Sequence, residues 1–375
     1  MYLVTGGAGF IGSHLVNSLL GQGYRVRVLD NLHPQIHGPD RQLPDCFPDE
    51  VEFVLGDVRD EQVLKYALKD VAKVFHLVAE TGVGQSMYEA GSYARTNVVG
   101  TATLWDAIHS VGAVEKVILA SSRAVYGEGT YSCPNCGRVR PESRSQARLA
   151  KGQWDPLCPV CGHAIQSVAT SEQDTPHPTS VYGITKLSQE QLSLTLGRSY
   201  GIPVVVLRFF NVYGSRQALS NPYTGILATF LARIRSENPL HIYEDGQQLR
   251  DFVHVTDVVQ ACNLAAANDE AQFQVFNVGN GQPTSIAQLA RSLLRLCNED
   301  ETERKLEVTR HYRVGDIRDC YADISKIKSM LGYEPSLSLS EGLRKFLSWA
   351  ASQSLVDRTE EAAAELTSAG LLHRG

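Results

Sequence analysis

A glycine-rich segment at residues 5–12, TGGAGFIG, constrains the fold of this chain more than any other feature. It follows the apolar run YLVT (2–5) and precedes SHLVNSLL, so it links an expected strand to an expected helix. Glycine here lets the backbone turn tightly and lets a pyrophosphate approach the amides at the helix start. The segment predicts a βα unit that binds a dinucleotide, and the alternative is a tight turn without a ligand. The pattern is formed by Gly6, Gly7, Gly9 and Gly12.

Short apolar runs and longer mixed stretches alternate along residues 1–127. Strands that alternate with helices form a parallel sheet with right-handed crossovers, so the sequence predicts an α/β fold with a doubly wound parallel sheet. The expected strands lie at 2–5, 24–30, 51–57, 73–79, 116–122 and 202–212, and the expected helices at 11–22, 60–70, 97–112, 226–234, 285–296, 341–353 and 357–370.

Asp30 ends the second expected strand. A carboxylate there accepts hydrogen bonds from both ribose hydroxyls of an adenosine and repels a 2′-phosphate, which favours NAD over NADP. The next residues, Asn31 and Leu32, offer no basic phosphate site, although Arg41 is within reach in the loop. Asp57, at the end of the third expected strand, is interpreted as an adenine contact, with a helix N-cap as the alternative.

The segment VYGITK places Tyr182 and Lys186 four residues apart, on one face of an expected helix. A phenol with a pKa of about 10 is a poor base at neutral pH. A nearby ammonium group and a positive nicotinamide ring favour the phenolate, which can then accept a proton. The pair therefore predicts a tyrosine base assisted by a lysine, and the alternative is a surface pair on a helix.

With these residues in place, the chain resembles the extended short-chain dehydrogenase/reductase family, in its nucleotide-sugar epimerase/dehydratase branch. The resemblance covers nearly all of the chain outside the 128–175 segment and the tail. It rests on TGGAGFIG (5–12), LDNL (29–32), GDVRD (56–60), HLVAETGVGQS (76–86), NVVGT (97–101), SSRAVYG (121–127), VYGITK (181–186), LRFFNVYG (207–214), RDFVHVTDV (250–258) and RVGDIRD (313–319).

The resemblance implies a Rossmann sheet for NAD and a smaller α/β domain for a nucleotide sugar. We expect the NAD-binding domain at 1–127, about 176–211 and 251–279, the sugar-binding domain at about 212–250 and 280–340, and a helical tail at 341–375. The implied cofactor-binding residues are Gly6, Gly9, Phe10, Ile11, Gly12, Asp30, Asn31, Asp57, Val58, Ala79, Asn97, Tyr182 and Lys186.

The resemblance also narrows the reaction. Ser122 completes a Ser-Tyr-Lys catalytic set and would hydrogen-bond the reacting sugar oxygen. Dehydratases and decarboxylases of the family carry carboxylic acids at the next positions, whereas this chain has Arg123 and Ala124. The implied activity is a nucleotide-sugar 4-epimerase with bound NAD; a 4-ketoreductase using the same residues is an alternative. The implied substrate-binding residues are Arg123, Asn211, Arg250 and Arg313.

Two Cys-Pro-x-Cys-Gly units interrupt the enzyme-like sequence within residues 128–175. Four thiolates at this spacing suit tetrahedral zinc with no open coordination position, so the segment predicts an inserted zinc ribbon with a structural metal. Disulfides are the alternative. Several basic residues surround the units; we interpret them as solvated arginines, with a phosphate-binding patch as the alternative. The predicted ligands are Cys133, Cys136, Cys158 and Cys161.

Composition limits the remaining functions. A net charge of −6 speaks against nucleic-acid binding by the whole molecule, and no apolar run has membrane-spanning length. We expect a cytoplasmic protein and, from the resemblance, a homodimer through the 97–112 and 180–199 helices. The cysteine units and tail resemble those of dTDP-L-rhamnose 4-epimerases; UDP-glucose and UDP-glucuronate 4-epimerases are alternatives. A non-catalytic NAD-sensing zinc-ribbon protein is a remote alternative.

Overall fold

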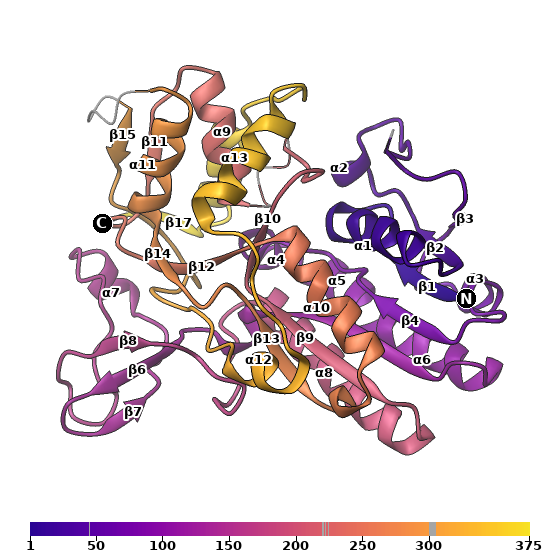
Figure 1. Ribbon diagram of the computed structural model, residues 1–375. Helices are drawn as coiled ribbons and strands as arrows, with labels where there is room; N and C mark the ends of the chain where they lie inside the picture. The colour runs from indigo at the N-terminus through magenta and orange to yellow at the C-terminus, as the bar shows by residue number, and fades with distance from the viewer. Residues whose placement is uncertain (45, 220, 222, 224, 300–304) are drawn as a thin grey trace.

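The computed structural model describes the chain except residues 45, 220, 222, 224 and 300–304. Its centre is a parallel sheet of seven strands in the order β13-β9-β5-β4-β1-β2-β3, so the predicted doubly wound sheet is confirmed (Figure 1). The strands are β1 (Tyr2–Thr5), β2 (Val26–Asp30), β3 (Glu52–Leu55), β4 (Lys73–His76), β5 (Lys116–Ser122), β9 (Val204–Phe209) and β13 (Val275–Val278).

Helices cover both faces of this sheet. Along β1, Leu3 belongs to one hydrophobic cluster and Val4 to the other, because successive side chains point to opposite faces. Both faces are therefore buried, which explains why the strands read as continuous apolar runs. One layer contains α1 (Phe10–Gly21), α10 (Val255–Ala267) and α12 (Ser325–Leu331), and the other α3 (Glu61–Ala67), α6 (Gly100–Val111) and α8 (Val181–Tyr200).

The structure differs from the expected elements at two places. The expected strand 202–212 divides, because β10 (Asn211–Tyr213) leaves the main sheet and pairs with β12 (Leu249–His254). The expected helix 97–112 begins as a π-helical segment, Ala94–Val99, before α6. Short helices complete the connections: α2 (Pro34–His37), α4 (Val83–Ser86), α5 (Ala90–Tyr93), and 3₁₀ turns at Arg123–Tyr126 and Asp269–Ala271.

A second lobe lies above the carboxyl ends of the strands (Figure 1). Phe230, Leu293 and Phe346 belong to its separate hydrophobic cluster, so α13, which we expected in the tail, packs into this lobe. No helix among the described residues is long and apolar enough to span a membrane. The lobe contains α9 (Ile226–Arg235), α11 (Ile286–Leu296), α13 (Leu339–Ala350) and short strands β11 (Leu240–Ile242), β14 (Pro283–Ser285), β15 (Leu306–Val308) and β16 (His311–Arg313).

The insert is a three-stranded antiparallel sheet, β6 (Thr130–Cys133), β7 (Gly137–Val139) and β8 (Gln166–Val168), with α7 (Gln146–Leu149) beside it. The interpretation of its arginines as solvated is wrong for Arg144. That side chain is 2% exposed and lies 2.8 Å from Glu244 and 3.3 Å from Glu128. Because buried charges require partners, Arg144 joins the insert to the second lobe.

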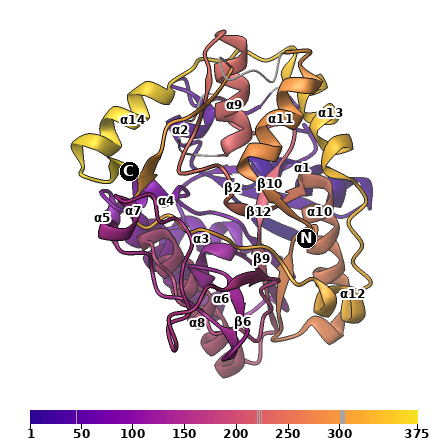
Figure 2. The same cartoon turned by 90° about the vertical axis from the view of Figure 1, so that its left-hand side faces the viewer.

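The tail after α13 returns to the second lobe. Its helix α14 (Thr359–Ser368) is followed by β17 (Leu372–Arg374), which pairs antiparallel with β16 (Figure 2). Beyond β17, the amide of Gly375 donates to the carbonyl of Arg310 at 3.0 Å. The last residues of the tail are therefore attached to the strand that carries Arg313.

Candidate active site

A cavity of about 610 Å³ lies between the main sheet and the second lobe. We call its two walls the sheet side, formed by residues 6–124 together with Tyr182 and Lys186, and the lobe side, formed by residues 209–366. Nearly all the predicted site residues line it: Gly6, Gly9, Phe10, Ile11, Gly12, Asp30, Asn31, Asp57, Val58, Ala79, Ser122, Arg123, Tyr182, Lys186, Asn211, Arg250 and Arg313.

The glycine loop has the geometry that a dinucleotide requires. Gly6 has a φ of +71°, and a Cβ there would lie 3.0 Å from the nitrogen of Val78. A Cβ on Gly12 would lie 2.2 Å from the carbonyl oxygen of Gly6, so the helix approaches the loop as only glycine permits. The N-cap Gly9 supplies no side-chain cap to α1, and the first amides of a helix have no partner within it. These amides fit a pyrophosphate.

Asp30 is held rigidly at the end of β2. Its carboxylate accepts hydrogen bonds from the amides of Ala8 at 3.1 Å and Leu32 at 2.9 Å. His37 lies 3.8 Å away, and burial lowers the pKa of its imidazole, which favours the neutral ring at neutral pH. Arg41 does reach this loop, where it donates to the carbonyl oxygens of Leu32 and Asn31. The carboxylate is thus fixed where an adenosine ribose is expected.

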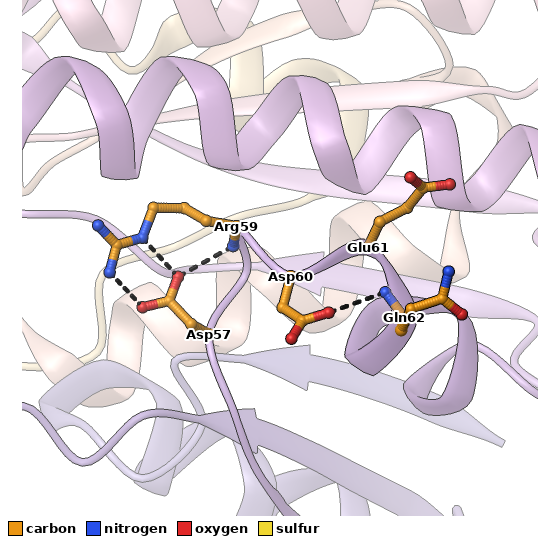
Figure 3. A pocket seen from close by; sticks show the side chains of 5 residues that line it. All are labelled: Asp57, Arg59, Asp60, Glu61 and Gln62. Atoms are coloured by element: carbon orange, nitrogen blue, oxygen red, sulfur yellow. Dashed lines mark hydrogen bonds and ion pairs between the residues drawn. The ribbon is translucent and has the colours of Figure 1, made fainter.

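Asp57 is not the N-cap of the following helix. Asp60 caps α3 by accepting from the amides of Gln62 at 2.9 Å and Val63 at 3.2 Å (Figure 3). Asp57 instead accepts two hydrogen bonds from the Arg59 guanidinium, at 2.8 and 2.6 Å, which lower its pKa to about 2. The N-cap alternative is therefore wrong, and the adenine contact stays a prediction.

Ser122 and Tyr182 come together from β5 and α8. Ser122 ends its strand and caps the following 3₁₀ turn, while Ser180 caps α8 by accepting from the amide of Gly183 at 3.1 Å. Burial raises the pKa of the Tyr182 phenol, and the Ser122 hydroxyl and the Arg123 guanidinium oppose that rise. The two side chains thus line the same cavity, with the Ser122 hydroxyl near enough to act on the Tyr182 phenol.

Lys186 lies one helical turn after Tyr182 and also lines the cavity. Its Nζ donates to the carbonyl of Ala120 at 2.8 Å and to the side chain of Gln189 at 2.9 Å. Burial lowers the pKa of the ammonium to about 7, and the charge of Glu190 opposes this.

Asn97 is the predicted cofactor residue that lies behind the cavity wall. It is fully buried, and its Oδ1 accepts from the amide of Glu80 at 2.8 Å. Its Nδ2 donates to the carbonyl of Glu80 at 3.1 Å and to the hydroxyl of Thr185 at 2.9 Å. The contacts of Asn97 therefore fix the loop after β4 against α8.

The expected substrate residues differ in how freely they face the cavity. Arg250 donates to three carbonyl oxygens, those of Leu249, Arg318 and Ile317. Arg313 forms a 2.8 Å ion pair with Asp316.

Arg123 and Asn211 lack such partners. Among the described residues, Arg123 makes no ion pair, and Oδ1 of Asn211 is buried without a hydrogen-bond partner. Burial and the neighbouring charge of Arg250 lower the pKa of Arg123. A free guanidinium and an unsatisfied amide oxygen facing one cavity favour a polar ligand.

Sequence reasoning missed the contribution of the tail to the cavity. Thr359, Ala362, Ala363 and Leu366 of α14 line the lobe side, although nothing in their local sequence distinguishes them from a surface helix. Asp316 was also missed as a lining residue, despite its place in the quoted RVGDIRD motif.

Short α2, likewise not foreseen, covers one end of the cavity. Gln35 in this helix donates to Gln85 at 3.1 Å on the sheet side and to Asn221 at 3.2 Å on the lobe side. Gln85 and Asn221 are both buried. These side-chain amides connect three separate loops across the cavity.

The insert gathers its four predicted cysteine ligands at one point. Their sulfur atoms all lie within 4.8 Å of one another, and all four are free thiols. Tetrahedral thiolate coordination of zinc needs four sulfurs around one point, at about 2.3 Å from the metal, so the cluster fits such a centre. The disulfide alternative finds no support in these free thiols.

The comparison with protein families agrees with the geometry of the cavity. A model described as the NAD dependent epimerase/dehydratase family matches residues 2–146 and 158–279. The chain is similar to a dTDP-L-rhamnose 4-epimerase of Burkholderia thailandensis, with 39% identity over 354 residues, 94% of this chain and 95% of that protein.

Solved structures show the same fold. A UDP-glucose 4-epimerase of Thermotoga maritima with UDP-glucose has a TM-score of 0.75 and 32% identity, over 93% of this chain and 98% of that one. A UDP-glucuronic acid 4-epimerase of Bacillus cereus, in complex with UDP-glucuronic acid and NAD, has a TM-score of 0.75 and 28% identity over the same shares. These matches confirm the resemblance found in the sequence, and the chain belongs to the NAD dependent epimerase/dehydratase family.

Proposed function

We propose that this protein is a nucleotide-sugar 4-epimerase that keeps NAD bound and acts on dTDP-L-rhamnose. The observation that carries the reaction type is the surroundings of Tyr182. The Ser122 hydroxyl and the Arg123 guanidinium act on its phenol, and neither residue is a carboxylic acid. Elimination of water needs a second acid/base pair, whereas oxidation and re-reduction at one carbon need a single proton acceptor.

In this mechanism each residue has one role. The glycine loop and Asp30 would hold the pyrophosphate and the adenosine ribose of NAD, which when bound would supply a reversible hydride acceptor. Tyr182 takes the proton of the C4 hydroxyl and later returns it, while Ser122 donates a hydrogen bond to the same sugar oxygen. The ammonium of Lys186 stabilises the phenolate. Because oxidation and reduction cancel, turnover consumes no cofactor.

The substrate assignment is supported by 39% identity to the dTDP-L-rhamnose 4-epimerase over nearly the whole of both chains. A UDP-uronate is a second candidate because of Arg123. Its guanidinium makes no ion pair among the described residues and is close enough to Tyr182 to act on its phenol. A sugar carboxylate would satisfy that charge.

The test is an NMR assay of the purified protein without added cofactor. The panel contains dTDP-L-rhamnose, UDP-glucose and UDP-glucuronate, with GDP- and CDP-sugars as controls. We expect C4 epimerisation, fastest with dTDP-L-rhamnose. Preference for UDP-glucuronate, lost in Arg123→Met, would establish the uronate instead. No turnover without added cofactor, together with stoichiometric consumption of NADH once it is supplied, would identify a ketoreductase and overturn the epimerase.

We also propose that the four cysteines of the insert hold one structural zinc ion. Metal analysis of freshly purified, reduced protein should give one zinc per chain. Cys158→Ser should lose the metal and lower the melting temperature, because metal-binding energy contributes to the folding of such a site. Cys46→Ser, at an exposed thiol outside the insert, is the matched control. Wild-type protein that contains no zinc, with the same melting temperature as Cys158→Ser, would exclude the site.

We also propose that the protein is a cytoplasmic homodimer. Val99 and Ile184 lie on the two helical segments expected at the dimer interface, and each of these apolar side chains is 51% exposed. Sedimentation should give twice the mass of the chain, and Ile184→Glu should give monomers. The free thiols agree with a reducing compartment. A monomeric wild type at micromolar concentration would contradict the dimer.

A further inference from the structure

Gln189 occupies an unexpected position beside the proposed active site. It is fully buried on α8, one turn after Lys186, and it makes hydrogen bonds on two sides. Its Oε1 accepts from Nζ of Lys186 at 2.9 Å, and its Nε2 donates to the hydroxyl of Thr101 at 2.7 Å. A buried amide with both ends bonded has one orientation.

The orientation of that amide follows from the groups behind it. Thr101 donates its hydroxyl proton to the carbonyl of Asn97 at 2.6 Å, so its oxygen is left to accept from others. His76 places Nε2 at 3.0 Å from the same oxygen, and its Nδ1 lies 2.8 Å from the hydroxyl of Thr5. Burial lowers the pKa of His76 to about 3, so the ring is neutral. Because the Thr101 hydroxyl already donates its proton to Asn97, the 3.0 Å contact places the proton of His76 on Nε2. Thr101 therefore accepts from both His76 and Gln189.

This arrangement allows a single orientation of the Gln189 side-chain amide. Its NH₂ group must face Thr101, because that oxygen has no further proton to give, and its carbonyl oxygen must face Lys186. Two of the three N–H groups of Lys186 are then fixed, one by Gln189 and one by the carbonyl of Ala120. The third remains for the cavity that Lys186 lines.

We propose that Gln189 is a positioning residue that holds the ammonium of Lys186 in its charged form and aims its remaining N–H group at the reacting cofactor and Tyr182. The inference rests on the proposed role of Lys186. The supporting wall is rigid because Thr5, His76 and Thr101 are all buried. Thr5 ends β1, immediately before the glycine loop, so the same hydrogen-bonded chain connects the lysine to the cofactor-binding turn.

Charged and titratable groups near Lys186 do not duplicate this role. Glu190 favours the ammonium, but its carboxylate is bonded to Arg208 at 2.9 and 2.7 Å and to the hydroxyl of Ser121 at 2.5 Å. His76 is neutral, and Tyr182 is the group that Lys186 is proposed to assist. Gln189 is therefore an uncharged acceptor that, together with the carbonyl of Ala120, opposes the effect of burial on the lysine.

The experiment compares two substitutions with opposite expected effects. Gln189→Met keeps the volume but removes the acceptor, so the alkaline loss of kcat should move to lower pH by about 1–2 units, the size expected for a lost hydrogen bond to a charged group. Gln189→Glu places a carboxylate there and should move the same limb to higher pH. NAD content and melting temperature are measured alongside, and Gln191→Met, at an exposed position of the same helix, is the control.

Opposite shifts of the alkaline limb would support the positioning role, because a structural role alone would not give shifts of opposite sign. Unchanged profiles in the folded variants would overturn it. Lys186→Met separates this failure from failure of the proposed function. If Lys186→Met retains turnover, the catalytic assignment is wrong; if it is inactive while both Gln189 profiles match wild type, only the role of Gln189 is wrong. Should Gln189→Met fold poorly, the upward shift in Gln189→Glu still decides the question.

Discussion

The sheet side of the cavity takes its lining mostly from loops that directly follow strands, whereas the lobe side draws on segments spread between residues 209 and 366. On the sheet side, Gly6 follows β1 and Asp30 ends β2, so one strand end places each group. On the lobe side, Arg313 forms an ion pair with Asp316, and its strand β16 pairs with β17. Arg144 in turn donates a hydrogen bond to the carbonyl of Asp316.

This difference shows that the two walls depend on different kinds of contact. A local turn places the sheet-side groups, so they tolerate changes elsewhere in the chain. Long-range ion pairs and strand pairings place the lobe-side groups, so changes far from the cavity should alter it. Substitutions on each side test this contrast, and they follow in order of the size of their expected effect.

The largest effect is expected at Tyr182, on the sheet side. Tyr182→Phe removes the proton acceptor and should lower kcat by about 10²–10⁴-fold with NAD still bound. NMR turnover and the NAD content of the denatured protein are the measurements. Tyr93→Phe is the control, because Tyr93 packs edge-on against Tyr182 and its hydroxyl donates to the carbonyl of Thr81. Near-normal turnover by Tyr182→Phe would refute the catalytic assignment.

The next effect is expected at the ion pairs that join the insert to the lobe side. Arg144→Met leaves Glu128 and Glu244 buried without this partner and should lower the free energy of unfolding by about 3–5 kcal/mol. It should also raise KM, because Nη2 of Arg144 no longer donates to the carbonyl of Asp316. Urea unfolding and kinetics measure both. Arg148→Met is the control, and equal stability of the two variants would contradict the coupling.

A smaller effect is expected where α14 forms the wall. Ala363→Trp should raise KM for the nucleotide sugar about tenfold by occupying part of the cavity, a loss of about 1.4 kcal/mol of binding. Its NAD content should not change. Ala364→Trp, at the exposed neighbouring position, should behave as wild type. Equal KM values in both variants would show that the tail does not bound the substrate.

The smallest effect is expected on the sheet side, at Arg59. The pKa of Asp57 is about 2 beside this guanidinium and 3.8 without perturbation, so the pair stabilises the fold above pH 3.8 and loses this contribution as the pH falls towards 2. Because the pair is partly exposed, Arg59→Met should cost less than about 1 kcal/mol at pH 7. The stability difference from wild type should shrink as the pH falls below 4. A difference independent of pH would contradict the pairing.

The sheet side could be predicted from sequence because its information is local. The strand ending at Ser122, the glycine loop and the helix carrying Tyr182 were each read from contiguous residues and all line one cavity. The strand β13 (Val275–Val278) was not foreseen.

The lobe side and the supporting wall could not be predicted in the same way. Arg144 resembled a solvated arginine, because its partners Glu128 and Glu244 are distant in sequence and become neighbours only in the fold. Gln189 belongs to no recognised motif, and its proposed role depends on a hydrogen bond to Thr101, which lies on another helix. Such contacts depend on tertiary packing, which hydrophobic periodicity does not encode.

The attachment of β17 to β16 has a consequence for the order of events during synthesis. Chains grow from the N-terminus at about 5–20 residues per second, so the loops after β1 to β4 leave the ribosome roughly tens of seconds before α14 is made. A nascent chain can thus acquire its dinucleotide while the wall that encloses the sugar does not yet exist. The residues expected to hold NAD are therefore made before those that enclose the sugar nucleotide.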